Sequence, residues 1–277
     1  MSSSVHISGK NVAYEVIGSG TTTLVAIPGI GDTRASYRRL APVLARAGFS
    51  VYLMDLRGHG ASDVGFDGYR SEDIGDDIVA LLESLDLKDV TVVGNSVGAA
   101  AGVHAALRSE RISRLVSLSG FVSDPPNFAL IRPMLSLMFA RPWGVAAWGK
   151  YRKTLFVTPP TDFESNHADL LANLAEPGRL AAVRKMMCAS KSGIAARLHE
   201  LKIPTLVAMG AGDPDFPDPA AEAARQAEIL GGDNSVVMID GAGHYPQVEQ
   251  PESTARAIID FVPRLVAESA AEVGAGT

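Results

Sequence analysis

Ser96 lies at the centre of the segment with the clearest chemical signature, Gly94-Asn-Ser-Val-Gly98. The β-branched run at residues 90–93 precedes it and an alanine-rich run follows, so the sequence predicts a strand, a sharp turn and a helix. The two flanking glycines tolerate the strained backbone and close strand–helix contact of such a turn. The hydroxyl is then presented at a helix N-terminus, where free N–H groups and the helix dipole favour developing negative charge. Ser96 is therefore the candidate nucleophile.

Ser96 needs a base, because a serine hydroxyl is a weak nucleophile near neutral pH. That base is expected to be a histidine oriented by a carboxylate. His244 is the candidate, since it lies in the glycine-rich loop 241–246 directly after the predicted strand 235–239. Active residues of open α/β sheets lie beyond the carboxyl ends of strands. His59 stands between two glycines in the turn-rich loop 55–60 and is expected to have a structural role.

The carboxylate is expected to follow a strand as well. The apolar run 205–209 leads into a loop that contains both Asp213 and Asp215, and either could serve. Asp213 is favoured because it lies nearer the end of the strand. The resulting chain order of serine, aspartate and histidine is the order expected for an α/β sheet with this type of turn.

Strand-like and helix-like segments alternate along most of the chain, which predicts an α/β fold with a mostly parallel sheet covered by helices on both faces. Ser71 is expected to cap the helix that follows it. The expected strands are 5–7, 12–17, 23–27, 51–54, 90–93, 115–118, 205–209 and 235–239. The expected helices outside the central stretch are 36–47, 71–85, 97–109, 219–230 and 251–265.

Residues 123–201 interrupt this alternation. They contain both tryptophans, several prolines and patches of helical periodicity at 127–140, 162–175 and 178–188, without an evident strand. We therefore expect a core domain formed by residues 1–122 and 202–277, with residues 123–201 inserted as a helical cap. Five arginines of this stretch compete as possible carboxylate-binding groups, and a solvated face is expected for each of them: Arg132, Arg141, Arg152, Arg179 and Arg184.

The composition indicates a soluble globular protein with one sizeable core, since 47% of the 277 residues are hydrophobic and 20% are charged. A net charge of −6 gives no electrostatic case for nucleic acid or for an anionic membrane. No apolar run approaches the roughly 20 residues of a membrane span. The single cysteine, Cys188, excludes an internal disulfide and fits a reducing compartment, so a cytoplasmic location is expected.

The chain resembles the α/β-hydrolase superfamily over nearly its whole length. The matching motifs are GNSVG at 94–98, DLRGHGASD at 55–63, GAGD at 210–213 and GAGHYPQVEQPE at 241–252. The resemblance implies a mostly parallel eight-stranded sheet with a helical cap insertion, and a triad of Ser96, His244 and Asp213. Neither a metal nor an organic cofactor is implied. The expected partner is a small-molecule substrate, and the expected assembly is a monomer or a homodimer.

The resemblance also implies two backbone donors for the developing oxyanion. One is the N–H of Val97, directly after the nucleophile. The second comes from the loop 28–32, where similar enzymes usually have His-Gly and this chain has Pro28-Gly29. Ile30 supplies the second N–H by position, and Gly29 and Gly31 remain alternatives.

The central stretch resembles the helical cap of this superfamily, which shapes the pocket and excludes water. The residues expected to line an apolar site are Trp143, Trp148, Phe139, Phe156 and Met186. The alternative for each of them is packing in the core of the cap.

The expected function is a serine hydrolase that cleaves a carboxylic ester, thioester or lactone of a small to medium, rather apolar substrate. A C–C bond hydrolase of ring-fission products is an alternative, because GNS at this turn also occurs in such enzymes. Those usually carry tryptophan after the histidine, where this chain has Tyr245. Two further hypotheses are a non-hydrolytic biosynthetic enzyme and a slow-turnover ligand sensor.

Overall fold

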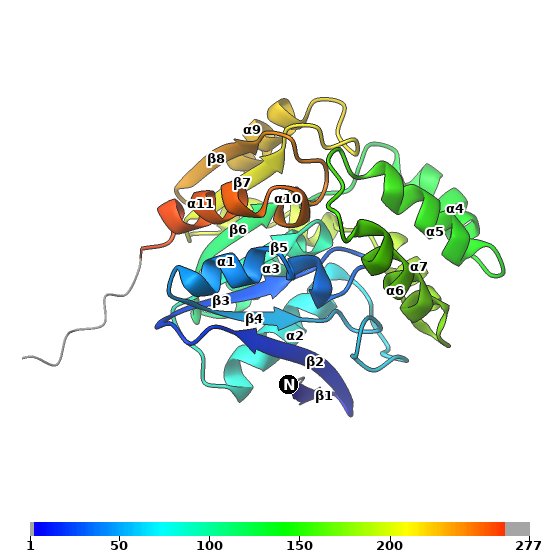
Figure 1. Ribbon diagram of the computed structural model, residues 1–277, viewed down its shortest axis with the longest axis horizontal. Helices are drawn as coiled ribbons and strands as arrows, with labels where there is room; N and C mark the ends of the chain where they lie inside the picture. Colours follow the sequence, from blue (N-terminus) through cyan, green and yellow to red (C-terminus); the bar gives the residue numbers. More distant parts are fainter. Residues whose placement is uncertain (1–2, 264–277) are drawn as a thin grey trace, which may run out of the picture.

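The computed structural model describes residues 3–263, which form one eight-stranded sheet with helices on both faces (Figure 1). The strand order is β1-β2-β4-β3-β5-β6-β7-β8. The first two strands pair antiparallel with each other, β2 pairs antiparallel with β4, and the remaining pairs are parallel. The predicted fold class is thus confirmed. The strands are β1 Ser3–Ile7, β2 Lys10–Ile17, β3 Thr22–Ile27, β4 Phe49–Met54, β5 Val90–Asn95, β6 Ile112–Leu118, β7 Thr205–Gly210 and β8 Asn234–Ile239.

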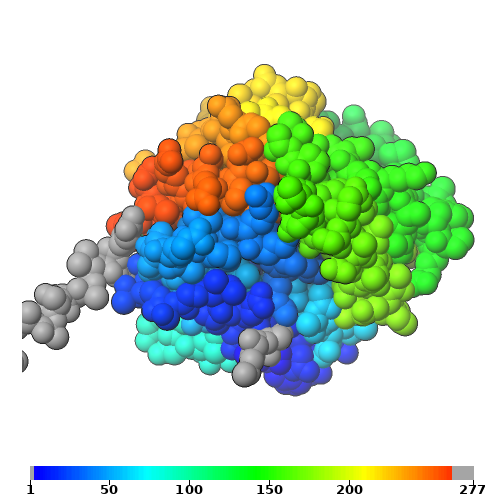
Figure 2. Space-filling model, viewed as in Figure 1, coloured from blue at the N-terminus to red at the C-terminus, as the bar shows by residue number. Residues whose placement is uncertain are grey.

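Helices bury an apolar layer on each face of the sheet. The short 3-10 helix η1 (Arg34–Tyr37), α1 (Leu40–Arg46) and α11 (Pro251–Phe261) cover one face, where Leu40, Leu44 and Ile258 pack on strand residues. Helices α2 (Ser71–Ser84), α3 (Val97–Arg108) and α9 (Pro219–Ile229) cover the opposite face. The N-terminal α1 and the C-terminal α11 lie side by side although they are about 200 residues apart in sequence (Figure 2).

The parallel strands end at one edge of the sheet, and this edge positions the loops that carry the candidate residues. Each residue of β5 is buried, as expected for a central strand covered on both faces. Its last residue, Asn95, pairs with Leu118 of β6, while Gly94 pairs with Ile27 at the end of β3. The loops after β3, β5, β6, β7 and β8 therefore leave the sheet on the same side.

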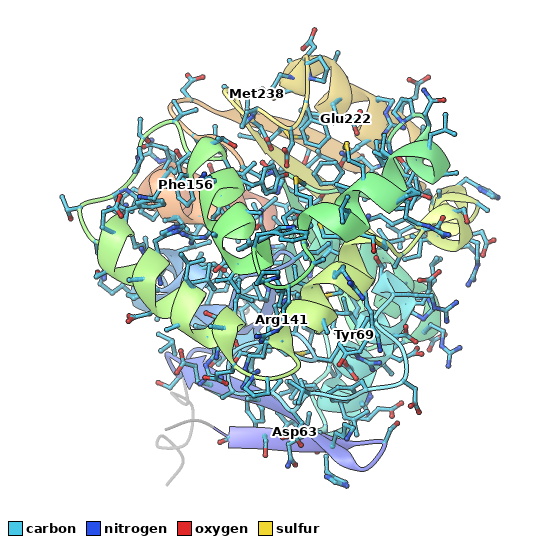
Figure 3. All side chains as sticks on the ribbon, turned by 90° about the vertical axis from the view of Figure 1, so that its right-hand side faces the viewer. Asp63, Tyr69, Arg141, Phe156, Glu222 and Met238 are labelled. Carbon is cyan, nitrogen blue, oxygen red and sulfur yellow. The ribbon has the colours of Figure 1, made fainter. Side chains whose placement is uncertain are left out.

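Between β6 and β7, a stretch that the structure describes throughout, the chain forms helices and no strand, and these helices lie over one side of the molecule (Figures 1 and 3). We call residues 123–201 the cap segment. Buried side chains of Phe139, Trp148, Leu170, Leu174 and Val183 give it a small core of its own. Its helices are α4 Phe128–Met138, α5 Gly144–Thr154, α6 Phe163–Ala175, α7 Arg179–Met187, α8 Ser192–Ala195 and the 3-10 helix η2 Leu198–Glu200.

Several local expectations differ from the structure. The predicted helix 36–47 divides into η1 and α1. Pro42 lies within the first turn of α1, where proline is tolerated because the N–H that it lacks would have no partner in the helix. Ser71 does not cap α2 but is its first residue; Asp73 instead accepts the N–H of Arg70 at 2.7 Å. Helix α5 has no counterpart among the helices that the sequence predicts. The last two residues of the predicted helix 251–265 lie outside the described range.

No helix within residues 3–263 combines the length and the apolar character that a membrane span requires.

Candidate active site

Ser96 stands at the turn between β5 and α3, in a backbone conformation with φ 55° and ψ −118°. Such positive φ values are rare for residues other than glycine. A Cβ at Gly94 would lie 2.3 Å from the backbone of Gly98, and one at Gly98 would lie 2.6 Å from the carbonyl oxygen of Ile27. Both positions therefore require glycine, which explains the spacing of the motif.

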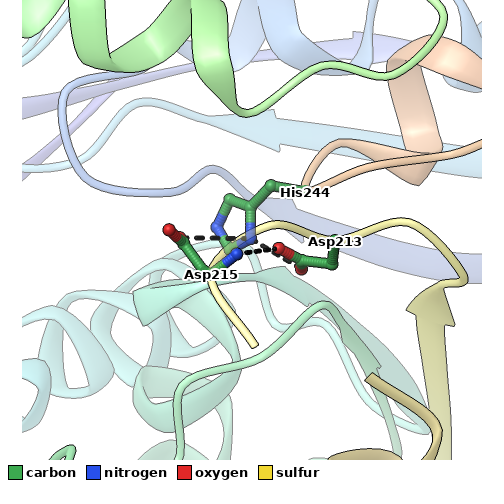
Figure 4. Close-up of side chains that lie close together, drawn as sticks. All are labelled: Asp213, Asp215 and His244. Atoms are coloured by element: carbon green, nitrogen blue, oxygen red, sulfur yellow. Dashed lines mark hydrogen bonds and ion pairs between the residues drawn. The ribbon is translucent and has the colours of Figure 1, made fainter. Parts of the chain in front are cut away.

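His244 and Asp213 meet at the carboxyl edge of the sheet, from the loops after β8 and β7 (Figure 4). The imidazole Nδ1 lies 2.9 Å from Oδ2 of Asp213, and both side chains are buried. Asn95 connects the neighbouring loops, because its Nδ2 donates to the carbonyl oxygens of His244 and Leu118 at 3.0 Å each. The carboxylate thus orients the ring and leaves Nε2 as the free imidazole nitrogen.

Ser96 and His244 line the same cavity, as do the oxyanion candidates Ile30 and Val97. Within the described part of the chain, no hydrogen bond joins the hydroxyl of Ser96 to His244. Catalytic hydrogen bonds are often long in the absence of substrate and tighten in the Michaelis complex. The structure thus brings the serine, the histidine and the aspartate together.

The environment of His244 favours its protonated form. Burial lowers the pKa of the imidazole, but the charge and hydrogen bond of Asp213 together with the charge of Asp215 raise it more, so the pKa lies above 6.5. The rings of Phe121 and Tyr245 lie beside the imidazole, with centroids 5.8 and 5.4 Å away. An imidazolium formed after proton transfer is therefore stabilised in this site.

Asp215 is a second carboxylate at the same histidine. Its Oδ2 lies 3.7 Å from Nδ1 of His244, and the hydroxyl of Tyr151 donates to its carboxylate at 2.9 Å. Its own N–H donates to Oδ1 of Asp213 at 3.0 Å. Burial raises the pKa of Asp215, and the charge of His244 opposes that rise. The shorter contact favours Asp213 as the orienting carboxylate, while Asp215 adds negative charge near the ring (Figure 4).

The same three side chains also have the donor types of a metal site, since one ligand atom from each lies within 4.8 Å of the others. The hydrogen bond between Nδ1 and the Asp213 carboxylate accounts for their approach without an ion.

The loop after β3 passes close to Ser96. A Cβ at Gly29 would lie 3.1 Å from Cβ of Ser96, and both Gly29 and Ile30 line the cavity. The N–H of Gly31 donates to Nε2 of His59 at 3.0 Å, so this alternative donor is already in use. In residues 3–263 the N–H groups of Ile30 and Val97 make no hydrogen bond with the protein. These two groups remain the candidates for the oxyanion.

His59 has the structural role expected for it and also fixes the loop after β3. Its Nδ1 lies 3.0 Å from the carbonyl oxygen of Arg57, so Nδ1 carries the proton and Nε2 accepts from Gly31. Burial lowers the pKa of His59 to about 4, which keeps the ring neutral near pH 7. Only the neutral ring can accept the Gly31 N–H.

The cavity beside Ser96 has a volume of about 110 Å³ and a mostly apolar wall. Trp148 lines it as expected, whereas Phe139 lies behind Trp148 in a ring contact of 5.4 Å. The expectation for Trp143 is wrong, because its side chain is half exposed and donates to the carbonyl oxygen of Leu137. Phe156 and Met186 do not line the cavity either, since Phe156 stacks on Tyr245 and Met186 packs in the apolar core. The remaining lining residues are Phe121, Pro125, Phe128, Leu135, Tyr151, Leu155, Met187, Lys191, Asp215 and Tyr245.

Arg152 differs from the expectation that the cap arginines are solvated. Its guanidinium is buried in the cap segment and lies 3.3 Å from the carboxylate of Asp32, while the rings of Phe156 and Tyr245 pack near it. No signal in the local sequence points to this position. Figure 3 looks onto the cap segment and labels two of its residues, Phe156 and Arg141. Arg141 is exposed, as expected. Arg179 is not, because its side chain is only 12% exposed and donates to Glu176 and to the carbonyl oxygen of Ser62.

A sequence profile described as the alpha/beta hydrolase family matches residues 24–257, so the chain belongs to this family. It is 28% identical over 262 residues to a 2-hydroxy-6-oxononadienedioate/2-hydroxy-6-oxononatrienedioate hydrolase of Paraburkholderia xenovorans, covering 90% of this chain and 89% of that protein. It is 26% identical to a 2-(acetamidomethylene)succinate hydrolase of Mesorhizobium japonicum, over 77% of this chain and 78% of that protein. A bromoperoxidase from Bacillus anthracis has the same fold, with a TM-score of 0.80, 21% identity and coverage of 94% and 99%. Hydrolase activity is the class that the family and these relatives support.

Proposed function

We propose that this chain is a serine hydrolase that cleaves a carboxylic ester, thioester or lactone of a small to medium, mainly apolar substrate. The observation that carries the proposal is that His244, which the buried Asp213 orients through a hydrogen bond, lines the same cavity as Ser96. A buried, carboxylate-oriented imidazole beside a serine on a strained turn is the arrangement that activates a hydroxyl nucleophile.

In the proposed reaction, Nε2 of His244 takes the proton of the Ser96 hydroxyl as its oxygen attacks the acyl carbonyl. The N–H groups of Val97 and Ile30 stabilise the oxyanion, and Asp213 stabilises the imidazolium. His244 then gives its proton to the leaving alcohol, which leaves an acyl group on Ser96. His244 then takes a proton from water as the water attacks the acyl-enzyme, and it returns that proton to the oxygen of Ser96 as the acid is released.

A C–C bond hydrolase is the second candidate, and the relatives that act on 2-hydroxy-6-oxononadienedioate favour it. Against it stands Tyr245, which occupies the position directly after the histidine where C–C bond hydrolases of ring-fission products usually carry tryptophan. The Tyr245 ring is stacked on Phe156 of the cap segment at 4.7 Å, so it belongs to the wall between the histidine and the cap segment.

The test is a panel of 4-nitrophenyl esters with acyl chains of graded length, assayed with the wild type and with Ser96→Ala. Ser84→Ala, at an exposed serine of α2, is the matched control. The proposal expects turnover of the shorter esters by the wild type and Ser84→Ala, and none above background by Ser96→Ala. Turnover of a 2-hydroxy-6-oxo-dienoate but of no ester would favour the second candidate instead.

A further inference from the structure

Lys191 is the only lysine or arginine among the described residues that line the cavity beside Ser96. It directly precedes α8, and only 8% of the residue is exposed. Lysine is among the residue types that are almost never buried unless they are paired. A lysine in the wall of a mostly apolar cavity therefore calls for an explanation.

The backbone of Lys191 is fixed on both sides. Its N–H donates to Oδ1 of Asp124 at 2.8 Å, and its carbonyl oxygen accepts the N–H of Ala195 at 2.8 Å. The second oxygen of Asp124 accepts the hydroxyl of Ser190. Because Asp124 is only a few residues from Phe121 and Pro125, it anchors Lys191 to the segment that supplies another part of the wall. The Asp124 carboxylate is thus occupied in positioning Lys191.

The ammonium group of Lys191 has no partner among residues 3–263: it makes no hydrogen bond, and no carboxylate oxygen lies within 4.0 Å of Nζ. Burial lowers its pKa, and Asp124 and Glu72 are the negative charges that act on it from a longer distance. By contrast, the exposed Lys153 has a carboxylate of Glu164 at 2.9 Å. A desolvated ammonium with three unused donors is costly, and a ligand acceptor would offset that cost.

We propose that Lys191 forms a carboxylate-binding subsite, so that the substrate is an ester with a free carboxylate at the end remote from the scissile bond. The carboxylate would accept from Nζ, the apolar wall would hold the intervening chain, and the acyl carbonyl would lie at Ser96. Asp215, in the wall beside His244, would repel a carboxylate placed at that end. This inference rests on the proposed function, because it names the substrate class of the same site.

The kinetic test uses two substrates that differ only in charge, the 4-nitrophenyl monoester of adipic acid and 4-nitrophenyl methyl adipate. The wild type is expected to prefer the monoester, as measured by the ratio of the two kcat/KM values. Lys191→Met should lower this ratio by about 10- to 100-fold, the range expected for loss of a charge-assisted hydrogen bond. The loss should lie mainly in KM, because the carboxylate is remote from the reacting bond, and Lys191→Arg should retain most of the preference.

Lys150→Met is the matched control, since Lys150 is exposed on α5 and does not line the cavity. It should leave the ratio unchanged. A wild type that prefers the methyl ester, or a Lys191→Met ratio equal to that of the wild type, would overturn the proposal.

A binding measurement separates failure of the subsite from failure of the ester chemistry. Hexanoate and hexanamide are titrated into Ser96→Ala by calorimetry, with and without Lys191→Met. The subsite predicts that hexanoate binds more tightly than hexanamide, and that Lys191→Met removes the difference. Equal binding of the two would contradict the subsite even if esters are cleaved. Selective hexanoate binding without any ester turnover would retain the subsite and reject the proposed function.

Discussion

Arg152 of the cap segment and Asp32 of the loop after β3 form an ion pair of 3.3 Å in which each side chain is only 1% exposed. Burial lowers the pKa of the guanidinium, but the charge of Asp32 and the hydrogen bond raise it more, so Arg152 carries its positive charge in this buried position. Asp32 comes two residues after the oxyanion candidate Ile30. The ion pair therefore connects the position of the cap segment to the geometry of the proposed oxyanion loop.

Breaking this pair should destabilise the protein strongly. Arg152→Met leaves the Asp32 carboxylate buried without its partner, which should lower the free energy of unfolding by about 3–5 kcal/mol. The double variant Arg152→Met/Asp32→Asn should cost less than the sum of the single variants. Urea unfolding measures all three. Lys153→Met, at an exposed ion pair, should have little effect, and strictly additive losses would contradict the coupling.

The pH dependence of kcat/KM should report on His244. Only the neutral imidazole can accept the Ser96 proton, so activity should fall about tenfold per pH unit below the pKa of His244. Because Asp213 and Asp215 raise this pKa, the fall should begin above pH 6.5. Asp215→Asn should move this acidic limb to lower pH, since it removes a raising charge. An unmoved limb in Asp215→Asn would show that Asp215 does not act on the imidazole.

Asp213→Asn should lower kcat by about 10⁴-fold, because an amide can hold the imidazole in the wrong tautomer and cannot stabilise its charged form. The fold should be retained, so the far-ultraviolet circular dichroism and the unfolding midpoint are measured alongside kcat. A near wild-type kcat in this variant would show that Asp215, and not Asp213, orients the imidazole.

The turn at Ser96 should store backbone strain. Ser96→Gly and Ser96→Ala should both be inactive, but the glycine variant should be more stable than the alanine variant by about 1–2 kcal/mol, because glycine adopts φ 55° without a Cβ clash. Urea unfolding of the two variants gives this difference directly. Equal stability would mean that the turn is relaxed.

His59 should make the fold sensitive to mild acid. Its folded pKa of about 4 lies below the ordinary value of 6.5, so the unfolded chain binds a proton that the folded chain resists. The stabilising contribution is present above pH 6.5 and is lost as the pH falls towards 4, at up to about 1.4 kcal/mol per pH unit. His244 has the opposite effect on stability. Because its folded pKa is raised, its stabilising contribution is present below pH 6.5 and is lost as the pH rises through that folded pKa. Urea unfolding between pH 7 and 5 should therefore be less pH-dependent in His59→Gln than in the wild type.

The turn at Ser96, the strands and the order of the candidate triad could be predicted because each depends on local chain properties. Gly94 is required because its backbone lies against that of Gly98, and Gly98 is required because it lies against the carbonyl oxygen of Ile27 in the neighbouring strand. Apolar runs identify buried strands without knowledge of their neighbours. From the sequence, the choice between Asp213 and Asp215 depends only on their distance from the strand end, and the 2.9 Å contact of Asp213 with His244 supports that choice.

The cap segment is less predictable, since its helices are short and proline-rich and their burial depends on how they pack. Trp143 and Trp148 are five residues apart and look alike in sequence, yet only Trp148 lines the cavity. Likewise nothing local distinguishes the buried Arg152 from the exposed Arg141.

Glycine spacing and apolar periodicity are enough to define the fold class and the residues able to carry the chemistry, because both are properties of short segments. The packing of distant segments determines which cap residues face Ser96, that Arg152 pairs with Asp32, and that Lys191 has no partner within residues 3–263. Asp32 and Arg152, for example, are 120 residues apart in sequence. Whether a side chain is buried at such a contact depends on both segments, so neither segment alone can reveal it.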